Sequence, residues 1–216
     1  MKKILCIDVG GTHVKLLASG AGESRKFKSG PSLTPDAMVS KAKELAVGWD
    51  YEAVSIGYPG VVLRGQIVSD PPHLAPGWVG FDFGQALARP VRVINDAAMQ
   101  ALGDYQGGRM LFLGLGTGLG AAMVVDGRVE AMELGHLPYR RGLAYEDYVG
   151  IAGLKRMGEK KWRKHVWAVV ELWRLALAPD TVVLGGGNAA RLGRAPEGVR
   201  LGDNAAAFKG GFQLWD

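Results

Sequence analysis

Two glycine-rich segments of this sequence each follow a short apolar run that is typical of a β-strand. The first is residues 8–12 (DVGGT), after the apolar run 3–7, and the second is residues 114–120 (GLGTGLG), after the run 110–113. Glycine permits positive φ angles and leaves backbone N–H groups open to an anion. Both segments therefore predict phosphate cradles at the tips of strand–turn–strand units.

The first cradle carries a carboxylate, Asp8, at the end of its strand. A carboxylate repels phosphate, so Asp8 is expected to act on it through a hydrated Mg²⁺, with the Thr12 hydroxyl and the Lys15 ammonium as further polar contacts. The alternative is a structural hairpin turn with an exposed aspartate. The phosphate-binding residues expected in the two cradles are Asp8, Gly10, Gly11, Thr12, Lys15, Gly116, Thr117 and Gly118.

Between the cradles, Asn95 and Asp96 stand at the end of the strand-like run 91–94. Phosphoryl transfer to an alcohol needs a carboxylate positioned to accept the hydroxyl proton. Asp96 is the predicted general base for that step. The structural alternative is that Asp96 only caps the helix expected over residues 97–105, a common role for aspartate.

Two runs match the loose dinucleotide-binding pattern G-x-G-x-x-G/A, residues 116–121 and 185–190. That fingerprint has to open a long helix. The first run leads instead into the strand-like segment 121–125, and the second meets Pro196 nine residues after Gly187. A dinucleotide site is therefore excluded, and the sequence contains no P-loop pattern either.

Local signals also predict the surrounding elements. Thr34 followed by Pro35 is typical of a helix start, with Gly48 as its terminator. The proline-rich segment 71–78 predicts an ordered loop, in which Trp78 covers a ligand or packs in a core. The last helix is expected over 205–208 only.

Six short motifs stand in the order found in ROK-family sugar kinases, and the sequence resembles the polyphosphate glucokinase branch of that family in particular. The resemblance implies an α/β protein with the two-domain actin-like ATPase and sugar kinase (ribonuclease H-like) fold, in which two five-stranded sheets flank an interdomain cleft. The motifs are DVGGTHVK at 8–15, GYPG at 57–60, NDA at 95–97, GLGTGLG at 114–120, ELGH at 133–136 and LGGGN at 184–188.

By this resemblance the acceptor is the C6 hydroxyl of a hexose, glucose first, and the donor is ATP or polyphosphate with Mg²⁺. The expected domains are 1–107, with the first cradle and the general base, and 108–216, with the second cradle and the donor-binding glycines Gly185, Gly186 and Gly187. Either Glu146 or Asp147 could instead be a solvated helix residue, and His136 a structural one. The implied sugar-binding residues are Gly60, Asn95, Asp96, Glu133, His136 and Glu146.

In many ROK kinases the histidine that corresponds to His136 binds a structural zinc together with downstream cysteines. This sequence has one cysteine, Cys6, inside the first apolar run. No structural zinc is therefore expected here, and Cys6 is interpreted as a small buried thiol.

Positive charge is concentrated between Lys155 and Lys164, where six basic residues and one acidic residue give a local balance of +5, equal to the net charge of the whole chain. Such a stripe could track polyphosphate, or it could be an ordinary solvated face. At about 100° per residue, one side of a single helix is expected to carry Arg156, Lys160, Arg163 and Lys164. A separate apolar side is expected to carry Trp162, Val166, Val169, Val170 and Trp173.

The family also contains sugar-responsive repressors, whose helix-turn-helix precedes the first cradle. Here that cradle begins at residue 8, so nucleic acid is not an expected partner. Two alternatives stay open: a catalytically weak sugar-binding or regulatory protein, and an ATP-dependent kinase for another hexose such as N-acetylmannosamine or fructose. The resemblance admits a homodimer, which no residue indicates. A cytoplasmic protein without a membrane partner is expected, because no run of about eighteen apolar residues occurs.

Overall fold

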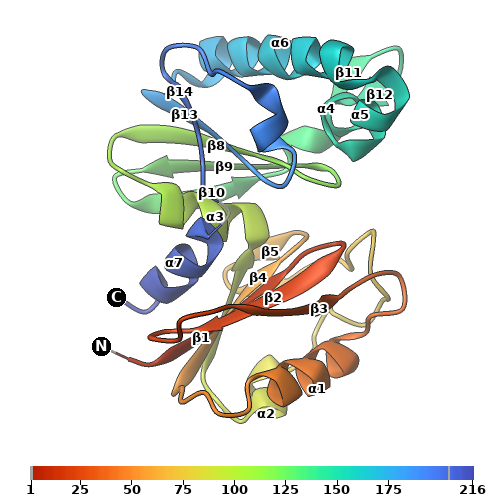
Figure 1. Cartoon of the computed structure of the whole chain (residues 1–216). Helices are drawn as coiled ribbons and strands as arrows, with labels where there is room; N and C mark the ends of the chain where they lie inside the picture. The colour runs from red at the N-terminus through yellow and green to blue at the C-terminus, as the bar shows by residue number, and fades with distance from the viewer. Residues whose placement is uncertain (1, 204) are drawn as a thin grey trace. The chain divides into compact units, whose positions relative to one another are not determined.

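The computed structural model describes residues 2–203 and 205–216, and the chain folds into two compact units (Figure 1). The first unit comprises the chain up to Gly103 together with Ala207–Asp216, and the second comprises Asp104–Ala206. Each unit is built on its own five-stranded sheet, as the resemblance implied. No helix within the described ranges is long and apolar enough to span a membrane.

The sheet of the first unit has the strand order β3-β2-β1-β4-β7. Its first three strands form an antiparallel meander, whereas β1, β4 and β7 run parallel to one another. A small separate hairpin, β5 and β6, follows β4. The strands of this unit are β1 (Ile4–Val9), β2 (His13–Ala18), β3 (Arg25–Lys28), β4 (Ala53–Tyr58), β5 (Val62–Leu63), β6 (Gln66–Ile67) and β7 (Val91–Asn95).

One face of this sheet packs against α1 (Pro35–Leu45) and α2 (Phe83–Leu87). The start of α1 is as predicted, because the Thr34 hydroxyl accepts the N–H of Ala37 at 3.2 Å and Pro35 is the first helical residue. Trp78, in the ordered loop over 71–78, is fully buried in the same core, and its indole N–H donates to the carbonyl of Ala75 at 2.8 Å. Trp78 is therefore a core residue.

The other face packs against α3 (Asp96–Asp104) and α7 (Ala206–Gln213), around the buried thiol of Cys6. The expectation of a last helix over 205–208 is wrong, since α7 continues to Gln213. Its glycine Gly210 is a poor helix former, but it lets α7 approach the backbone of Met99 more closely than any side chain would allow. This packing places the last ten residues in the first unit, whereas the sequence-based division at 107 had assigned them to the second.

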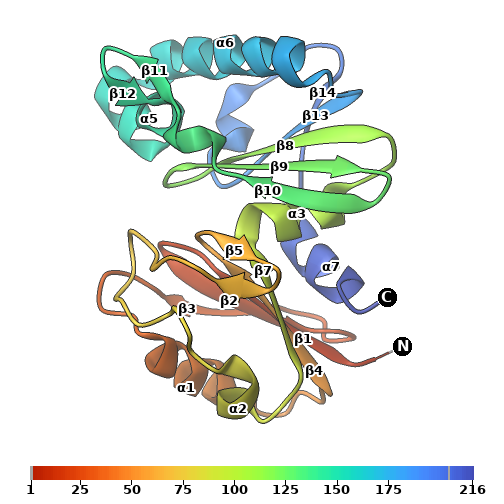
Figure 2. The same ribbon diagram turned by 180° about the vertical axis from the view of Figure 1, so that it is seen from behind.

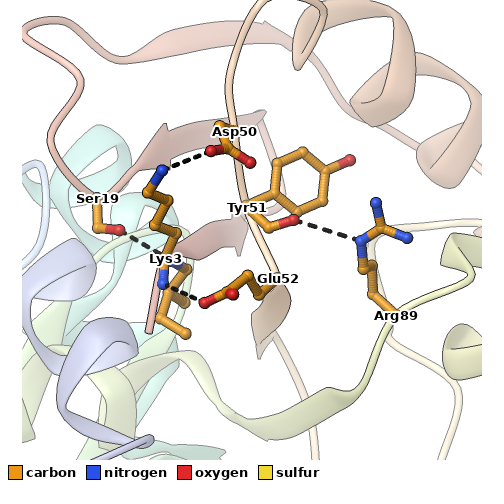
Figure 3. A network of polar contacts seen from close by, with 7 residues as sticks. Lys3, Ser19, Asp50, Tyr51, Glu52 and Arg89 are labelled. Carbon is orange, nitrogen blue, oxygen red and sulfur yellow. Dashed lines mark hydrogen bonds and ion pairs between the residues drawn. The ribbon is translucent and has the colours of Figure 1, made fainter. Parts of the chain in front are cut away.

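The amino ends of β1 and β4 are tied together by polar contacts at the edge of the sheet away from the cradle (Figure 3). Lys3 is paired through its ammonium with Asp50 at 2.5 Å and donates its backbone N–H to Glu52 at 3.2 Å. The hydroxyl of Ser19, just after β2, accepts the N–H of Ile4 at 2.9 Å. These contacts fix the shared register of the three strands.

The sheet of the second unit repeats the pattern, with the strand order β10-β9-β8-β13-β14. Strands β8, β9 and β10 are antiparallel, and β8, β13 and β14 are parallel. The elements of this unit are β8 (Arg109–Leu115), β9 (Leu119–Val125), β10 (Arg128–Met132), η1 (Leu134–His136), β11 (Pro138–Arg140), β12 (Leu143–Ala144), α4 (Tyr145–Val149), α5 (Ile151–Met157), α6 (Glu159–Leu177), β13 (Thr181–Gly185), η2 (Ala189–Leu192) and β14 (Val199–Leu201).

Helix α6 covers one face of this second sheet (Figure 2). Its predicted apolar side is confirmed, because Trp162, Val166, Val169, Val170 and Trp173 are all buried against the sheet. The single basic helix expected over 155–164 is wrong. Gly158, at φ +75°, separates α5 from α6, and the change of chain direction breaks the angular relation between Arg156 and the lysines that follow.

Candidate functional site

Strand register gathers the chemistry-bearing residues of the first unit at one edge of its sheet. Asp8 of β1 lies opposite Gly57 of β4, and Tyr58 of β4 lies opposite Asn95 of β7. The carboxyl ends of these parallel strands therefore meet, and two strand spacings of about 4.8 Å separate the backbone of Asp8 from that of the start of α3. The intervening residue, Gly57, has no side chain, and a Cβ there would collide with Met99 of α3.

The first cradle is the β1–β2 hairpin tip that the sequence predicts. The N–H of Gly10 donates to the carbonyl of His13 at 3.0 Å. Ser29, just after β3, supports the loop twice: its hydroxyl donates to the carbonyl of Gly10 at 2.6 Å, and its N–H donates to that of Thr12 at 3.0 Å. Because a trans peptide directs its N–H opposite to its C=O, the N–H of Gly11 points away from Ser29.

Asp8 is a largely buried carboxylate beside a lysine. Its side chain is 18% exposed, and its Oδ2 lies 3.9 Å from the Lys15 ammonium. Burial raises the pKa of Asp8, and the charge of Lys15 opposes that rise. Mg²⁺ in phosphoryl-transfer sites is held by one or two carboxylates, with water and substrate oxygens completing its shell. Asp8 offers one such carboxylate. Within 2–203 and 205–216 no group of three or more His, Cys, Asp or Glu residues is placed to hold a metal ion.

Asn95 and Asp96 make different hydrogen bonds at the start of α3. Asn95 Oδ1 accepts the N–H of Ala98 at 3.0 Å, which makes Asn95 the helix cap, and its Nδ2 donates to the carbonyl of Gly60 at 3.1 Å. Asp96 Oδ1 accepts the N–H of Ala97 at 2.7 Å. The i+3 capping bond weighed for Asp96 is thus made by its neighbour. Gly60 thus positions the Asn95 amide through its carbonyl, and that amide carries a second N–H besides the one that it donates to Gly60.

The second cradle, residues 116–118, is held in place by hydrogen bonds that its own carbonyl groups accept. The N–H of Ile151, the first residue of α5, donates to the carbonyls of Gly116 at 3.1 Å and Thr117 at 3.2 Å. Asn188 Nδ2 also donates to the Gly116 carbonyl, at 3.2 Å. The N–H groups of Thr117 and Gly118 must therefore point away from these partners. Two successive outward N–H groups form the kind of backbone concavity that binds anions.

Two residues that support this cradle lay outside the predicted site. Gly150 precedes α5, and a Cβ there would lie 2.7 Å from the Thr117 carbonyl and 3.2 Å from the Gly118 Cα. Asn188 belongs to a recognised motif, but no contact was assigned to it. Of the three glycines before it, Gly186 (φ +82°) leaves no room for a side chain, since a Cβ there would lie 2.7 Å from the Leu115 backbone, whereas a Cβ on Gly187 would face open space. Gly150 and Asn188 are each more than thirty residues from the cradle in the sequence, so no local sequence pattern could have identified them as its supports.

Three of the predicted sugar-binding side chains come together in the second unit. His136 lies between two carboxylates, with Nδ1 3.6 Å from Glu133 and Nε2 3.7 Å from Glu146. Glu146 also lies against Gly118, where a Cβ would collide with its Oε2. Asp147 faces differently, because its Oδ2 accepts the N–H of Ala144 at 2.8 Å and caps α4. Of the two acidic candidates, Glu146 is the one beside the cradle.

The four basic residues expected as one stripe are not equivalent. Arg156 donates to the carbonyl of Asp147 at 2.7 Å and stacks over Tyr148 at 5.2 Å from its ring centre. Arg163 is paired with Glu159 at 2.5 Å. Lys160 and Lys164 lie exposed on the first turns of α6. Two arginines therefore serve internal contacts, and two lysines face solvent.

Comparison with known proteins agrees with this geometry. The model of the ROK family matches residues 4–147. The chain belongs to the ROK family. This ROK protein is 26% identical over 203 residues to the polyphosphate glucokinase of Mycobacterium leprae (strain TN), an alignment that covers 84% of this chain and 62% of that relative. The chain thus spans under two thirds of that relative's length. The similarity confirms the resemblance to the polyphosphate glucokinase branch.

Other ROK relatives differ in the acceptor that their names give. The chain is 30% identical over 142 residues to the N-acetylmannosamine kinase of Salmonella newport (strain SL254), which covers 58% of this chain and 48% of that relative. The crystal structure of the inorganic polyphosphate/ATP-glucomannokinase of Arthrobacter sp. strain KM matches with a TM-score of 0.86 at 23% identity, covering 100% of both chains. This ROK protein therefore has the actin-like ATPase and sugar kinase fold.

Proposed function

We propose that this ROK protein is a hexose kinase that transfers a phosphoryl group from polyphosphate or ATP to the C6 hydroxyl of a sugar, with glucose as the first candidate. The observation that carries the proposal is the strand register of the first unit. In that register Asp8, at the first glycine-rich hairpin, and Asp96, the proposed general base, lie at the carboxyl ends of parallel strands in one sheet. Phosphoryl transfer depends chiefly on such positioning.

The proposed roles follow from the contacts. Asp96 accepts the hydroxyl proton, while the remaining amide N–H of Asn95 and the cluster of Glu133, His136 and Glu146 hold sugar hydroxyls. Carboxylates and an imidazole suit that task because they accept and donate in fixed directions. Asp8 would hold a Mg²⁺ ion through water, and the ion would supply charge neutralisation for the phosphates. The outward N–H groups of both cradles bind the phosphate oxygens.

The named relatives support this choice of substrates. A polyphosphate glucokinase and a polyphosphate/ATP-glucomannokinase favour glucose or mannose as acceptor and admit both donors. An N-acetylmannosamine kinase among the relatives keeps that sugar as an alternative acceptor. A catalytically weak sugar-binding protein is disfavoured, because Asp96 and the residues of both cradles are present in the sequence.

The test is the initial rate of sugar 6-phosphate formation in the presence of Mg²⁺. Glucose, mannose, fructose and N-acetylmannosamine are compared, each with ATP and with long-chain polyphosphate at matched terminal-phosphate concentration. We expect glucose to be phosphorylated, and we expect Asp96→Asn to lower kcat by about 10²- to 10⁴-fold.

Two controls accompany the rates. Calorimetric titration should show that Asp96→Asn still binds the sugar, and Asp36→Asn, which neutralises an exposed carboxylate on α1, should behave as the wild type. Near wild-type turnover by folded Asp96→Asn, or no transfer to any of these sugars from either donor, would contradict the proposal.

A further inference from the structure

A strongly basic face lies on the outer strands of the first sheet. Side chains alternate along a strand, so His13 and Lys15 of β2 share one face. The register places Lys28 opposite His13 and Lys26 opposite Lys15. These four residues, His13, Lys15, Lys26 and Lys28, are called the basic face below. Opposite residues lie about 5 Å apart and alternate residues along a strand about 7 Å apart, so the three lysine side chains leave the sheet from neighbouring positions.

The basic face is continuous with the first cradle. Lys15 lies opposite Asp8 in the sheet, with the two charged groups 3.9 Å apart. Ser29, the residue after Lys28, makes the two hydrogen bonds that hold the carbonyls of Gly10 and Thr12. A phosphate bound at the cradle would therefore be next to Lys15, with Lys26 and Lys28 further outward on the same face.

Most of this charge is not neutralised by the protein. Lys26 and Lys28 are exposed, and neither takes part in an ion pair among residues 2–203 and 205–216. Like charges directly opposite each other, such as Lys15 and Lys26, destabilise a sheet. Preventing edge-to-edge pairing can be the sole role of lysines on an edge strand such as β3. That role does not account for Lys15, which lies on β2, the neighbour of the edge strand.

The composition of the face distinguishes between polyanions. Proteins that bind single-stranded nucleic acid combine basic grooves with aromatic side chains on which bases stack. Phe27, the aromatic residue of β3, belongs to the opposite face by alternation and packs on the core of the first unit. The basic face thus offers point charges to phosphates and no aromatic surface to bases.

We infer that the basic face binds the distal phosphates of an inorganic polyphosphate chain whose terminal phosphate occupies the first cradle. This inference rests on the proposed kinase function and assigns its polyphosphate contacts to β2 and β3. It does not assign them to α5 and α6, where Arg156 and Arg163 are engaged in internal contacts.

The test compares two double charge reversals, Lys26→Glu/Lys28→Glu on the basic face and Lys41→Glu/Lys43→Glu on α1, which change the net charge equally. We expect the first to lower kcat/KM for long-chain polyphosphate roughly tenfold at low salt. It should lower kcat/KM far less for ATP and for tripolyphosphate, which has fewer phosphates to place on the basic face. The salt dependence of the KM for long-chain polyphosphate should also lose about one unit of slope per removed contact.

Further variants and ligands make the outcome decisive. Lys26→Gln/Lys28→Gln removes the two positive charges without adding negative ones, so it controls for any disturbance of the edge strand by the charge reversal. It should give a smaller loss of the same kind. The inference is overturned if Lys160→Glu/Lys164→Glu on α6 causes the larger loss, if the α1 control loses as much, or if single-stranded RNA of equal charge binds the face as tightly as polyphosphate. If the protein phosphorylates glucose with ATP but not with polyphosphate, this inference is overturned and the proposed function still stands.

Discussion

The two units use one sheet topology and arrive at two different phosphate cradles. In each, three antiparallel strands are followed by two parallel ones, and the cradle lies at the tip of the first hairpin. The residue of β1 opposite Gly57 is Asp8, and the residue of β8 in the matching position, opposite Gly185, is Gly114. The shared backbone therefore offers outward N–H groups in both cradles, whereas a carboxylate on the first strand itself occurs only in the first unit.

The supports of the two cradles differ as well. The first is held by one serine, Ser29, on the adjoining edge strand. The second is held by the backbone of Ile151 and by the side chain of Asn188, with Gly150 providing the space. A cradle whose own strands carry no charged side chain near the hairpin tip depends on rigid backbone placement, whereas the first cradle combines backbone placement with the charges of Asp8 and Lys15.

Within the comparison of the two cradles, the largest expected effect comes from removing the carboxylate that distinguishes the first cradle. Asp8→Asn should lower kcat about 10- to 100-fold, the usual cost of losing an outer-shell partner of a metal ion. The Mg²⁺ concentration for half-maximal rate should rise in the same variant. Glu23→Gln, which neutralises an exposed carboxylate of the same unit, is the control, and unchanged Mg²⁺ dependence in Asp8→Asn would remove the proposed metal role.

A smaller effect is expected from filling the space behind the second cradle. Gly150→Ala places a methyl group 2.7 Å from the carbonyls of Glu146 and Thr117, and such overpacking costs about 1–3 kcal/mol. Urea unfolding should show that loss, and the KM for the donor should rise. Gly22→Ala, where no atom lies within 4 Å of the new methyl group, should change neither quantity. Equal stability of the two variants would show that the second cradle is not rigidly backed.

A matched pair of truncations compares the two supports directly. Ser29→Ala and Asn188→Ala each remove one side-chain donor to a cradle carbonyl, a loss of about 1 kcal/mol. Ser29→Ala should cost more in donor KM, because the Gly116 carbonyl keeps its bond from Ile151 whereas the Gly10 carbonyl loses its side-chain donor. The sugar dissociation constant should not change in either variant. The reverse order of the two KM effects would contradict the comparison.

The smallest effect concerns an aromatic cluster that supports α4. His165 lies 3.2 Å from the Tyr139 hydroxyl, and its pKa is lowered from 6.5 by burial and by Arg140 and Arg156. The unfolded chain therefore takes up this proton at a higher pH than the folded one, and the free energy of unfolding should fall as the pH drops below about 6.5.

Urea titrations between about pH 7 and about pH 5 check this dependence. His165→Phe should flatten it slightly, and His73→Gln, in an exposed loop of the first unit, should not. An unchanged slope in His165→Phe would show that this histidine does not contribute to the acid sensitivity.

Local patterns predicted most of the fold because they depend on neighbouring residues. Alternation and glycine placement located both hairpins, Thr34 located the start of α1, and the apolar side of α6 followed from helical spacing. The basic helix failed because a constant angle per residue carries no information about the turn at Gly158. The last helix was underestimated because Gly210 lowers helix propensity and acts through a contact with α3.

The sequence by itself determined which residues could do chemistry: two glycine cradles, Asp8, Asp96 and the ELGH motif, in an order that identified the family. Only the tertiary structure decided that Asn95 caps α3, that Glu146 rather than Asp147 lies beside the second cradle, and that Lys26 lies opposite Lys15. These contacts join residues on separate elements, and they depend on strand register and helix packing, which local propensity does not encode.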